Sequence, residues 1–126
     1  MDWLTPLRGQ LVGIDTSPFI YLIERNPGFV ERVRPFFQLV DQDEIQAVTS
    51  PVTLIEVLVR PLGLGNANLA DEYRDILLNS SIKFVPVTTE VAEEAARLRS
   101  QHNLRTPDAI QLAAAITKGA TAFFDQ

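Results

Sequence analysis

The sequence contains no cysteine and only one histidine among its 126 residues. The absence of cysteine excludes disulfide bonds and thiolate metal sites, and it favours a reducing compartment. No apolar run approaches the roughly 20 residues that a membrane-spanning helix needs. The N-terminus, MDWLTPLRGQ, lacks the basic and apolar regions of a signal peptide. We therefore expect a soluble, cytoplasmic protein that does not associate with a membrane.

Basic residues are also scarce, because 11 Lys and Arg stand against 16 Asp and Glu, for a formal net charge of -5. A protein that holds nucleic acid by bulk electrostatics normally shows the opposite excess. Acidity does not exclude an enzyme that acts on nucleic acid, since carboxylates that bind divalent ions add negative charge that the bound ions cancel. An acidic chain is equally compatible with a basic segment of a partner protein.

Hydrophobic residues make up 46% of the chain, enough for one core, so we expect residues 1–126 to form a single domain. The hydrophobic pattern predicts strands at 10–14, 44–50, 82–87 and 120–124. It predicts helices at 18–25, 29–42, 50–62, 69–80, 89–103 and 106–119. Apolar strands that alternate with helices are typical of an α/β fold, in which helices cover both faces of a mostly parallel sheet.

Short polar residues precede several of these helices. Ser17 and Ser50 are each followed by proline, which is favoured in the first turn of a helix, so both serines are predicted N-caps. Thr89 and Thr106 are predicted N-caps of two later helices. Pro35 lies inside the second predicted helix, and we expect it either to bend this helix or to split it in two.

Three acidic residues stand in unusually apolar surroundings. Asp15 follows the first predicted strand, Glu56 lies inside VTLIEVLV, and Asp108 begins the most hydrophobic helix, PDAIQLAAAI. Each has an ordinary structural explanation on its own. Asp15 can cap the following helix, and Asp108 is stabilised by the helix dipole. Glu56 can form an ion pair with Arg60, one turn later on the same helix.

Taken together, these three acids predict a metal site. All of them lie near the start of helices on the expected carboxyl edge of the sheet, where open α/β folds bind ligands. Carboxylates brought together repel one another unless a cation neutralises them. An all-oxygen set of ligands suits Mg²⁺ or Mn²⁺ better than zinc. We expect waters and substrate phosphate oxygens to complete the coordination shell.

The segments GIDTS, SPVTLIEVL and TPDAIQLAAA resemble the three acidic motifs of the PIN-domain family, particularly the small toxins of bacterial VapBC-type toxin-antitoxin pairs. The resemblance covers roughly residues 11–125, and TPDAIQLAAA is its most specific part. It implies a central, mostly parallel sheet of four to five strands with helices on both faces. It also implies hydrolysis of RNA phosphodiester bonds with Mg²⁺ or Mn²⁺, a homodimer, and a cognate antitoxin as partner.

The resemblance assigns roles to individual residues. Asp15 and Asp108 would hold the metal, with Glu56 close by as a ligand or as the residue that orients a water. Ser17 stands where the family often has a small hydroxyl residue, and it would bond a metal-bound water or a backbone group; the N-cap explanation is equally good. Arg105 leads directly into the Asp108 motif and is the first candidate for contact with substrate phosphates, although solvation is the default for a surface arginine.

The C-terminal end departs from the family pattern. The family usually has a fourth acid, in a pattern like Thr-Asn-Asp just after the last strand, whereas this sequence reads TAFFDQ. Two alternatives stay open: Asp125 replaces the fourth acid in a shifted position, or the sequence lacks the residues that would supply it. A weakened fourth position would favour one bound ion over two.

Three functions compete on these observations. The first is a metal-dependent endoribonuclease that acts as the toxin of a type II toxin-antitoxin pair. The second is a catalytically impaired PIN-like protein that acts only as a binding or regulatory partner, and the missing Thr-Asn-Asp pattern supports it. The third is phosphoryl transfer through a phospho-aspartate, which is disfavoured because Ser17 stands where the common Asp-x-Asp signature has its second acid.

Overall fold

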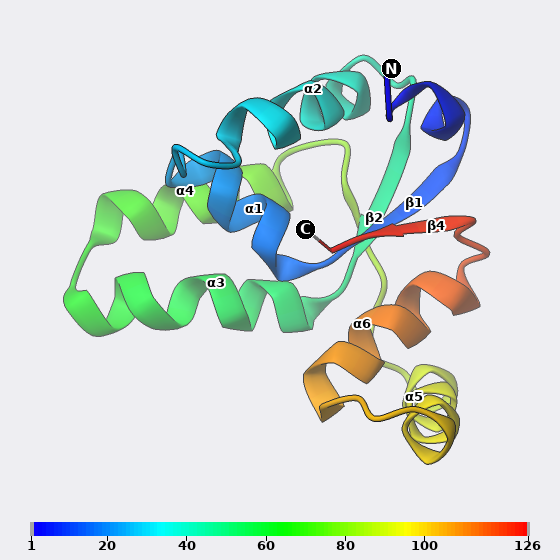
Figure 1. The fold of residues 1–126 in the computed structure, drawn as a ribbon. Helices are drawn as coiled ribbons and strands as arrows, with labels where there is room; N and C mark the ends of the chain where they lie inside the picture. Colours follow the sequence, from blue (N-terminus) through cyan, green and yellow to red (C-terminus); the bar gives the residue numbers. More distant parts are fainter. Residues whose placement is uncertain (1, 126) are drawn as a thin grey trace.

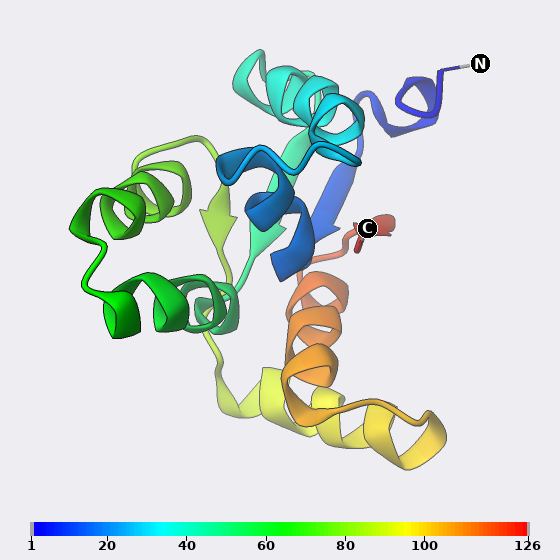
Figure 2. The ribbon, with the colours of Figure 1, turned by 60° about the vertical axis from the view of Figure 1, so that its left-hand side comes forward.

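The computed structural model describes residues 2–125, in which helices cover both faces of a parallel sheet (Figures 1 and 2). The strands are β1 (Leu11–Ile14), β2 (Gln46–Thr49), β3 (Lys83–Phe84) and β4 (Ala122–Phe124). A short 3-10 helix, η1 (Thr5–Leu7), precedes the helices α1 (Thr16–Ile23), α2 (Val30–Asp41), α3 (Pro51–Leu64), α4 (Ala67–Leu78), α5 (Thr89–Gln101) and α6 (Thr106–Thr117). Among residues 2–125, no helix combines the length and the apolar character that crossing a membrane requires.

The strand order is β3-β2-β1-β4, and every neighbouring pair is parallel. β1 therefore lies in the interior of the sheet, between β2 and β4. In the register of the sheet, Gly13 of β1 stands beside Val48 on one side and Phe123 on the other. The predicted α/β class and the parallel sheet are confirmed, with four strands in the described part of the chain. Because all strands run the same way, their carboxyl ends meet at one edge.

The two faces of the sheet are packed by different helices. On one face, α1 to α4 contribute to a core in which Phe19, Phe36 and Tyr73 are fully buried. On the other face, α5 and α6 pack through small and branched residues such as Val91 and Ala113. Figure 1 shows α5 and α6 together on one side of the sheet, and α1, α2 and α4 on the other. The amphipathic patterns thus determine which side of each helix is buried.

Gly13 allows α6 to approach β1 very closely. A Cβ atom at this position would lie 2.6 Å from the Cβ of Ala115 on α6 and 2.8 Å from the ring of Phe123 on β4. Real side chains do not tolerate such distances, so only glycine fits here. The close approach brings the helix that carries Asp108 against the strand that ends at Asp15.

The first two predicted N-caps have different outcomes. Ser50 is the N-cap of α3, and its hydroxyl accepts a hydrogen bond from the backbone N–H of Val52 at 3.2 Å, as predicted. The prediction for Ser17 is wrong, because α1 begins at Thr16, two residues earlier than predicted. Asp15 is its N-cap, and the carboxylate accepts a hydrogen bond from the Thr16 N–H at 2.7 Å. Aspartate and serine are about equally favoured as N-caps, and Asp15 precedes Ser17 in the sequence, so the helix begins directly after Asp15.

The later predictions for helix starts are displaced by one residue. α5 is capped by Thr88, so Thr89 is already helical, and α6 follows Arg105, so Thr106 is already helical. Both predicted caps are therefore wrong by one position. Pro35 lies within α2, which continues across it as one element, so the helix is not split.

Candidate active site

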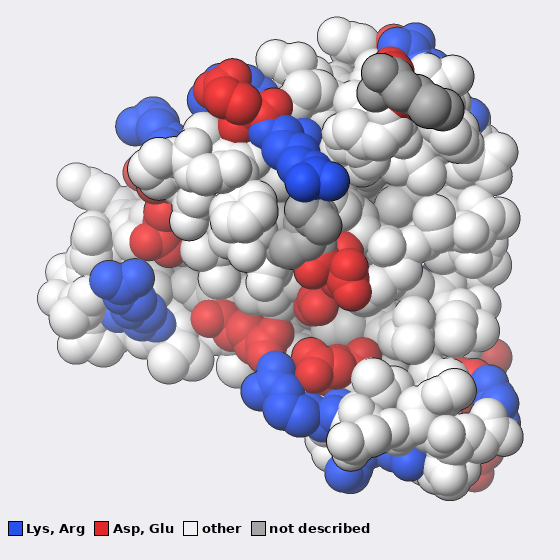
Figure 3. Space-filling model, in the orientation of Figure 1, with Lys and Arg blue, Asp and Glu red and all other residues white. Residues whose placement is uncertain are grey.

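Four acidic residues lie at the carboxyl edge of the sheet, where Glu56, Asp108 and Asp125 are near enough to Asp15 for their charges to act on it. Asp15 directly follows β1 and Asp125 directly follows β4, while Glu56 and Asp108 come from the first two turns of α3 and α6. The backbone N–H of Asp15 donates to the carbonyl oxygen of Phe124 at 2.9 Å, which holds the ends of the two strands together. Figure 3 shows acidic side chains grouped around the middle of this face of the molecule.

Asp15 occupies the electrostatic centre of this group. Partial burial of its carboxylate is the main cause of a raised pKa. The hydrogen bond from the Thr16 N–H opposes that rise, and the negative charges of Asp108, Glu56 and Asp125 add to it. The folded chain therefore disfavours the charged form of Asp15, which is the condition that a bound cation would relieve.

The donor chemistry of this edge fits a hard divalent cation. All four side chains offer carboxylate oxygens, and the sequence has no cysteine to supply a thiolate ligand. Such oxygen donors are the ligands of Mg²⁺ and Mn²⁺. Within residues 2–125, no three acidic or histidine side chains are already close enough to form a ligand set by themselves. The carboxylates thus act on one another through charge rather than through direct contact.

The two candidate substrate contacts are placed differently. Arg105 forms an ion pair with Asp108, in which its Nε donates to Oδ2 at 3.1 Å, and this hydrogen bond raises the pKa of the guanidinium. It neutralises one acid of the group, and its exposed side chain remains free to turn toward solvent. Ser17 lies on α1, half-buried, and no group in residues 2–125 forms a hydrogen bond with its hydroxyl.

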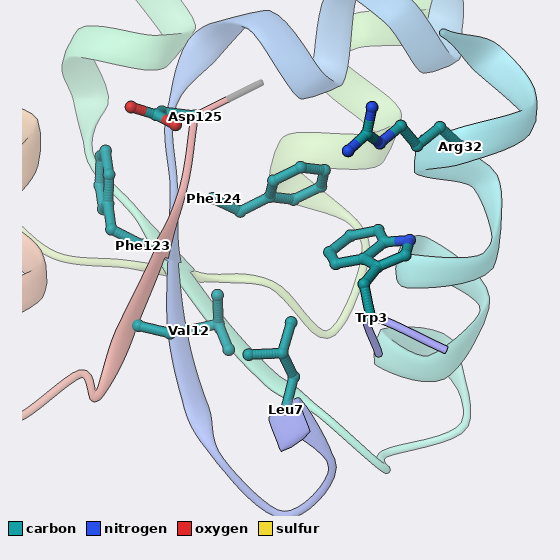
Figure 4. Close-up of a pocket in the computed structure, with 8 residues that line it drawn as sticks. Trp3, Leu7, Val12, Arg32, Phe123, Phe124 and Asp125 are labelled. Carbon is teal, nitrogen blue, oxygen red and sulfur yellow. The ribbon is translucent and has the colours of Figure 1, made fainter. Parts of the chain in front are cut away.

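Asp125 also borders a pocket on the outer side of β4. The pocket has a volume of about 290 Å³. Figure 4 shows Trp3, Phe124 and Arg32 on one side of it and Leu7 and Val12 at its base. The indole ring of Trp3 lies parallel to Phe36, with ring centroids 6.2 Å apart, and tilted against Phe124 at 5.1 Å. Trp3 thereby attaches the N-terminal segment to the core.

The predicted ion pair between Glu56 and Arg60 does not form. Arg60 instead faces Glu24, the C-cap residue of α1, at 3.6 Å, and Glu24 also accepts a short hydrogen bond from the hydroxyl of Tyr73. Glu56 accepts a hydrogen bond from the hydroxyl of Thr16 at 2.5 Å. The neighbour of Glu56 therefore comes from α1 and not from its own helix, because α1 packs directly against α3.

Beneath the carboxylates lies a network of buried polar side chains that the sequence patterns did not indicate. These side chains are the buried polar residues of the described chain: Thr16, Thr49, Ser50, Thr53 and Gln111. Hydrogen bonds connect all of them. The one available signal was Gln111, a polar residue in the middle of the otherwise apolar segment AIQLAAAI. The network joins the ends of β1 and β2 to α3 and α6.

A sequence model of the PIN domain matches residues 12–125, which is almost the whole chain. The chain therefore belongs to the PIN-domain family. This confirms the resemblance seen in its three acidic motifs. No curated protein matches the sequence.

Solved structures show the same fold at low sequence identity. VapC20 of Mycobacterium tuberculosis, described as a sarcin-ricin loop cleaving toxin, is 18% identical, with a TM-score of 0.73 over 92% of this chain and 88% of that chain. A toxin-antitoxin complex from Klebsiella pneumoniae is 24% identical, with a TM-score of 0.65 over 90% and 82% of the two chains. VapBC2 of Rickettsia felis, solved with a DNA fragment from the promoter, is 17% identical, with a TM-score of 0.64 over 89% and 85%.

Proposed function

We propose that this chain is an endoribonuclease that depends on Mg²⁺ or Mn²⁺ and is the toxin of a type II toxin-antitoxin pair. One observation carries the proposal: the negative charges of three acids, Glu56, Asp108 and Asp125, act on the half-buried Asp15 at the carboxyl edge of a PIN-domain sheet. Such a group is costly to maintain for stability alone, because each charge raises the cost of ionising Asp15. A divalent cation removes that cost.

The residues of the edge have separate tasks in this reaction. Asp15 and Asp108 supply the principal carboxylate ligands, and Glu56 serves as a third ligand or orients a water. A bound divalent ion lowers the pKa of an attacking water and screens the charge of the phosphate. Arg105 exchanges Asp108 for a phosphate oxygen of the RNA, since its exposed side chain can turn between them. Asp125 supports the site from the end of β4.

The test is cleavage of a mixed RNA pool by the purified chain with Mn²⁺, with Mg²⁺ and with EDTA. Asp15→Asn and Asp108→Asn should each abolish metal-dependent cleavage, because asparagine keeps the shape of the side chain and removes the charge that binds the cation. Asp71→Asn is the matched control, since Asp71 pairs with Arg74 on an exposed face of α4. This variant should cleave as the wild type does.

A second function is favoured by a specific feature of the same edge. Arg105 already pairs with Asp108, and no ready ligand set exists within residues 2–125, as expected for a PIN-like protein that only binds a partner. Folded wild type that cleaves no RNA with either metal would contradict the nuclease and favour this inert alternative. Cleavage that persists in EDTA would contradict the metal dependence.

We further propose two protein partners, a cognate antitoxin and a second copy of the chain. Two of the similar structures are described as toxin-antitoxin or VapBC complexes, which supports the antitoxin. The acidic net charge suits a basic antitoxin segment. On α3, Ile55, Val59 and Leu62 recur along one exposed side, and Val59 is 65% exposed. Such a side supports contact with another protein chain.

Light scattering after size-exclusion chromatography tests whether two copies of the chain form a dimer. We expect the wild type to be a dimer and Val59→Glu to be a folded monomer, because a charge on this side of α3 opposes apolar contact. Lys83→Glu is a control for the change of charge, since Lys83 is exposed on the edge strand β3. A monomeric wild type would contradict the homodimer and leave the side of α3 to the antitoxin.

A further inference from the structure

The centre of the buried polar network is the amide of Gln111. This residue is only 3% exposed and lies one turn after Asp108 on α6. Its carbonyl oxygen accepts a hydrogen bond from the hydroxyl of Ser50 at 2.6 Å. Its Nε2 donates a short hydrogen bond to Thr53 and lies 3.3 Å from the hydroxyl oxygen of Thr16. The amide therefore connects α6 with α1 and α3.

The direction of the hydrogen bonds in this network is determined by donor supply. An amide nitrogen is only a donor, and each hydroxyl has one hydrogen. Thr16 accepts from Gln111, so its own hydrogen is free for the carboxylate of Glu56, at 2.5 Å. A hydroxyl that donates to a carboxylate forms a charge-assisted hydrogen bond, which is stronger than one between neutral groups. The other hydrogen of the amide is donated to the hydroxyl of Thr53, which bonds to Thr49 and not to a carboxylate.

The same amide also reaches the central acid. Nε2 of Gln111 lies 3.5 Å from Oδ1 of Asp15, the oxygen that already accepts the Thr16 N–H. That oxygen is thus held on the protein side. The other oxygen of Asp15, Oδ2, has no hydrogen-bond partner within residues 2–125. One buried amide therefore touches Asp15 directly and Glu56 through Thr16.

We propose that Gln111 and Thr16 are positioning residues, which orient the carboxylates of Asp15 and Glu56 for a divalent cation. This inference rests on the proposed metal-dependent function. Neither residue contacts the reacting atoms, and neither is an acid, although Thr16 follows Asp15 in GIDTS and Gln111 lies within TPDAIQLAAA. Groups that orient metal ligands in this way typically change metal affinity or activity by about 10–100-fold when they are replaced.

Stability alone does not account for the network. A buried polar group costs free energy unless it is paired, and a pair of buried polar side chains is replaced by apolar groups of the same shape at little cost. An all-apolar contact between α6 and the sheet would therefore serve packing equally well. The polar side chains extend directly to the carboxylates, which is where an orienting function requires them.

The experiment compares two isosteric substitutions within the same network. Thr16→Val removes the hydroxyl that reaches Glu56. Thr49→Val removes another buried hydroxyl, which donates to the carbonyl oxygen of Ile14 at 3.0 Å and forms no hydrogen bond with a carboxylate. Mn²⁺ is titrated into each purified protein by calorimetry, and thermal unfolding is recorded in EDTA. Gln111→Met, which keeps the length of the side chain, and Thr16→Ser, which keeps the hydroxyl, complete the set.

We expect Thr16→Val and Gln111→Met to weaken Mn²⁺ binding by about 10–100-fold. Thr16→Ser should bind Mn²⁺ as tightly as the wild type does. Thr49→Val should lower the unfolding temperature without changing the affinity for Mn²⁺. RNA cleavage should show a reduced kcat with an unchanged KM in the first two variants.

Three different outcomes would overturn the inference. If the wild type binds Mn²⁺ and Thr16→Val binds it equally well, the network is structural, while the metal-dependent function stands. If the wild type binds no Mn²⁺, the proposed function fails and the inference fails with it. Equal loss of affinity in Thr49→Val and Thr16→Val would also contradict a specific orienting role.

Discussion

Replacing Gly13 by alanine should destabilise the protein and displace the helix that carries Asp108. The new Cβ would lie 2.6 Å from the Cβ of Ala115 and 2.8 Å from the Cδ1 of Phe123. Carbon atoms prefer separations of about 3.5–4.0 Å, so both contacts are too short by roughly 1 Å. The Cβ of Ala115 cannot rotate away, because it is attached directly to the backbone. Relief requires movement of α6 away from β1.

Overpacking of this kind typically costs about 1–3 kcal/mol. A backbone-anchored neighbour places Gly13→Ala in the upper half of that range. For a chain of this size, a loss of about 2 kcal/mol lowers the unfolding temperature by roughly 5–10 °C. Thermal unfolding followed by circular dichroism measures the change. RNA cleavage should fall as well, since α6 holds one of the acids.

The matched control is Gly63→Ala, the same substitution near the end of α3. A Cβ at Gly63 has no neighbouring atom within 4 Å, and alanine is the better helix former. This variant should be as stable as the wild type or gain up to about 1 kcal/mol. Adding Ala115→Gly to Gly13→Ala should recover part of the lost stability. An unfolding temperature of Gly13→Ala equal to or above that of the wild type would refute the packing argument.

Two further predictions concern ionisable groups. Because the pKa of Asp15 is raised in the folded state, its ionisation costs stability as the pH rises above the ordinary value of 3.8, and the full cost is present once the raised pKa is passed. Asp15→Asn should therefore be more stable than the wild type at pH 7 in EDTA. The free energies of unfolding of the two proteins should become equal near pH 4. A variant less stable than the wild type at pH 7 would contradict this. Tyr73→Phe removes the hydrogen bond to Glu24 and should lower the free energy of unfolding, measured with urea, by about 1 kcal/mol. Arg60 remains as a partner of Glu24 in this variant. Tyr21→Phe is its control, since the Tyr21 ring stacks on Phe29 and phenylalanine keeps this contact. An equal loss of stability in both variants would contradict the role of the hydrogen bond.

Much of the fold follows from local sequence signals. The alternation of apolar strands with helices predicted the parallel sheet, and Ser50 followed by proline correctly marked the start of α3. These signals depend on spacing along the chain, so they can be read without knowledge of distant residues. The starts of α5 and α6 were displaced by one residue and that of α1 by two, because neighbouring residues, such as Asp15 before α1, compete for the cap position.

The acids of the candidate site were also visible in the sequence, because a carboxylate after an apolar strand or inside an apolar helix is conspicuous. Their roles in metal binding and catalysis remain predictions. Their partners were not predictable. Glu56 pairs with Thr16 rather than with Arg60, and the choice depends on how α1 packs against α3.

The sequence by itself determined the order of the strands and helices along the chain and the placement of acids just after strands or in the first turns of helices, since hydrophobic period, capping and proline act over a few residues. Only the tertiary structure decided which side chains share a hydrogen bond. Gln111 and Asp15 are 96 positions apart in the chain, and the order β2-β1-β4 together with the close approach of α6 at Gly13 brings them together. Contacts of this kind depend on packing between distant elements, which no local pattern encodes.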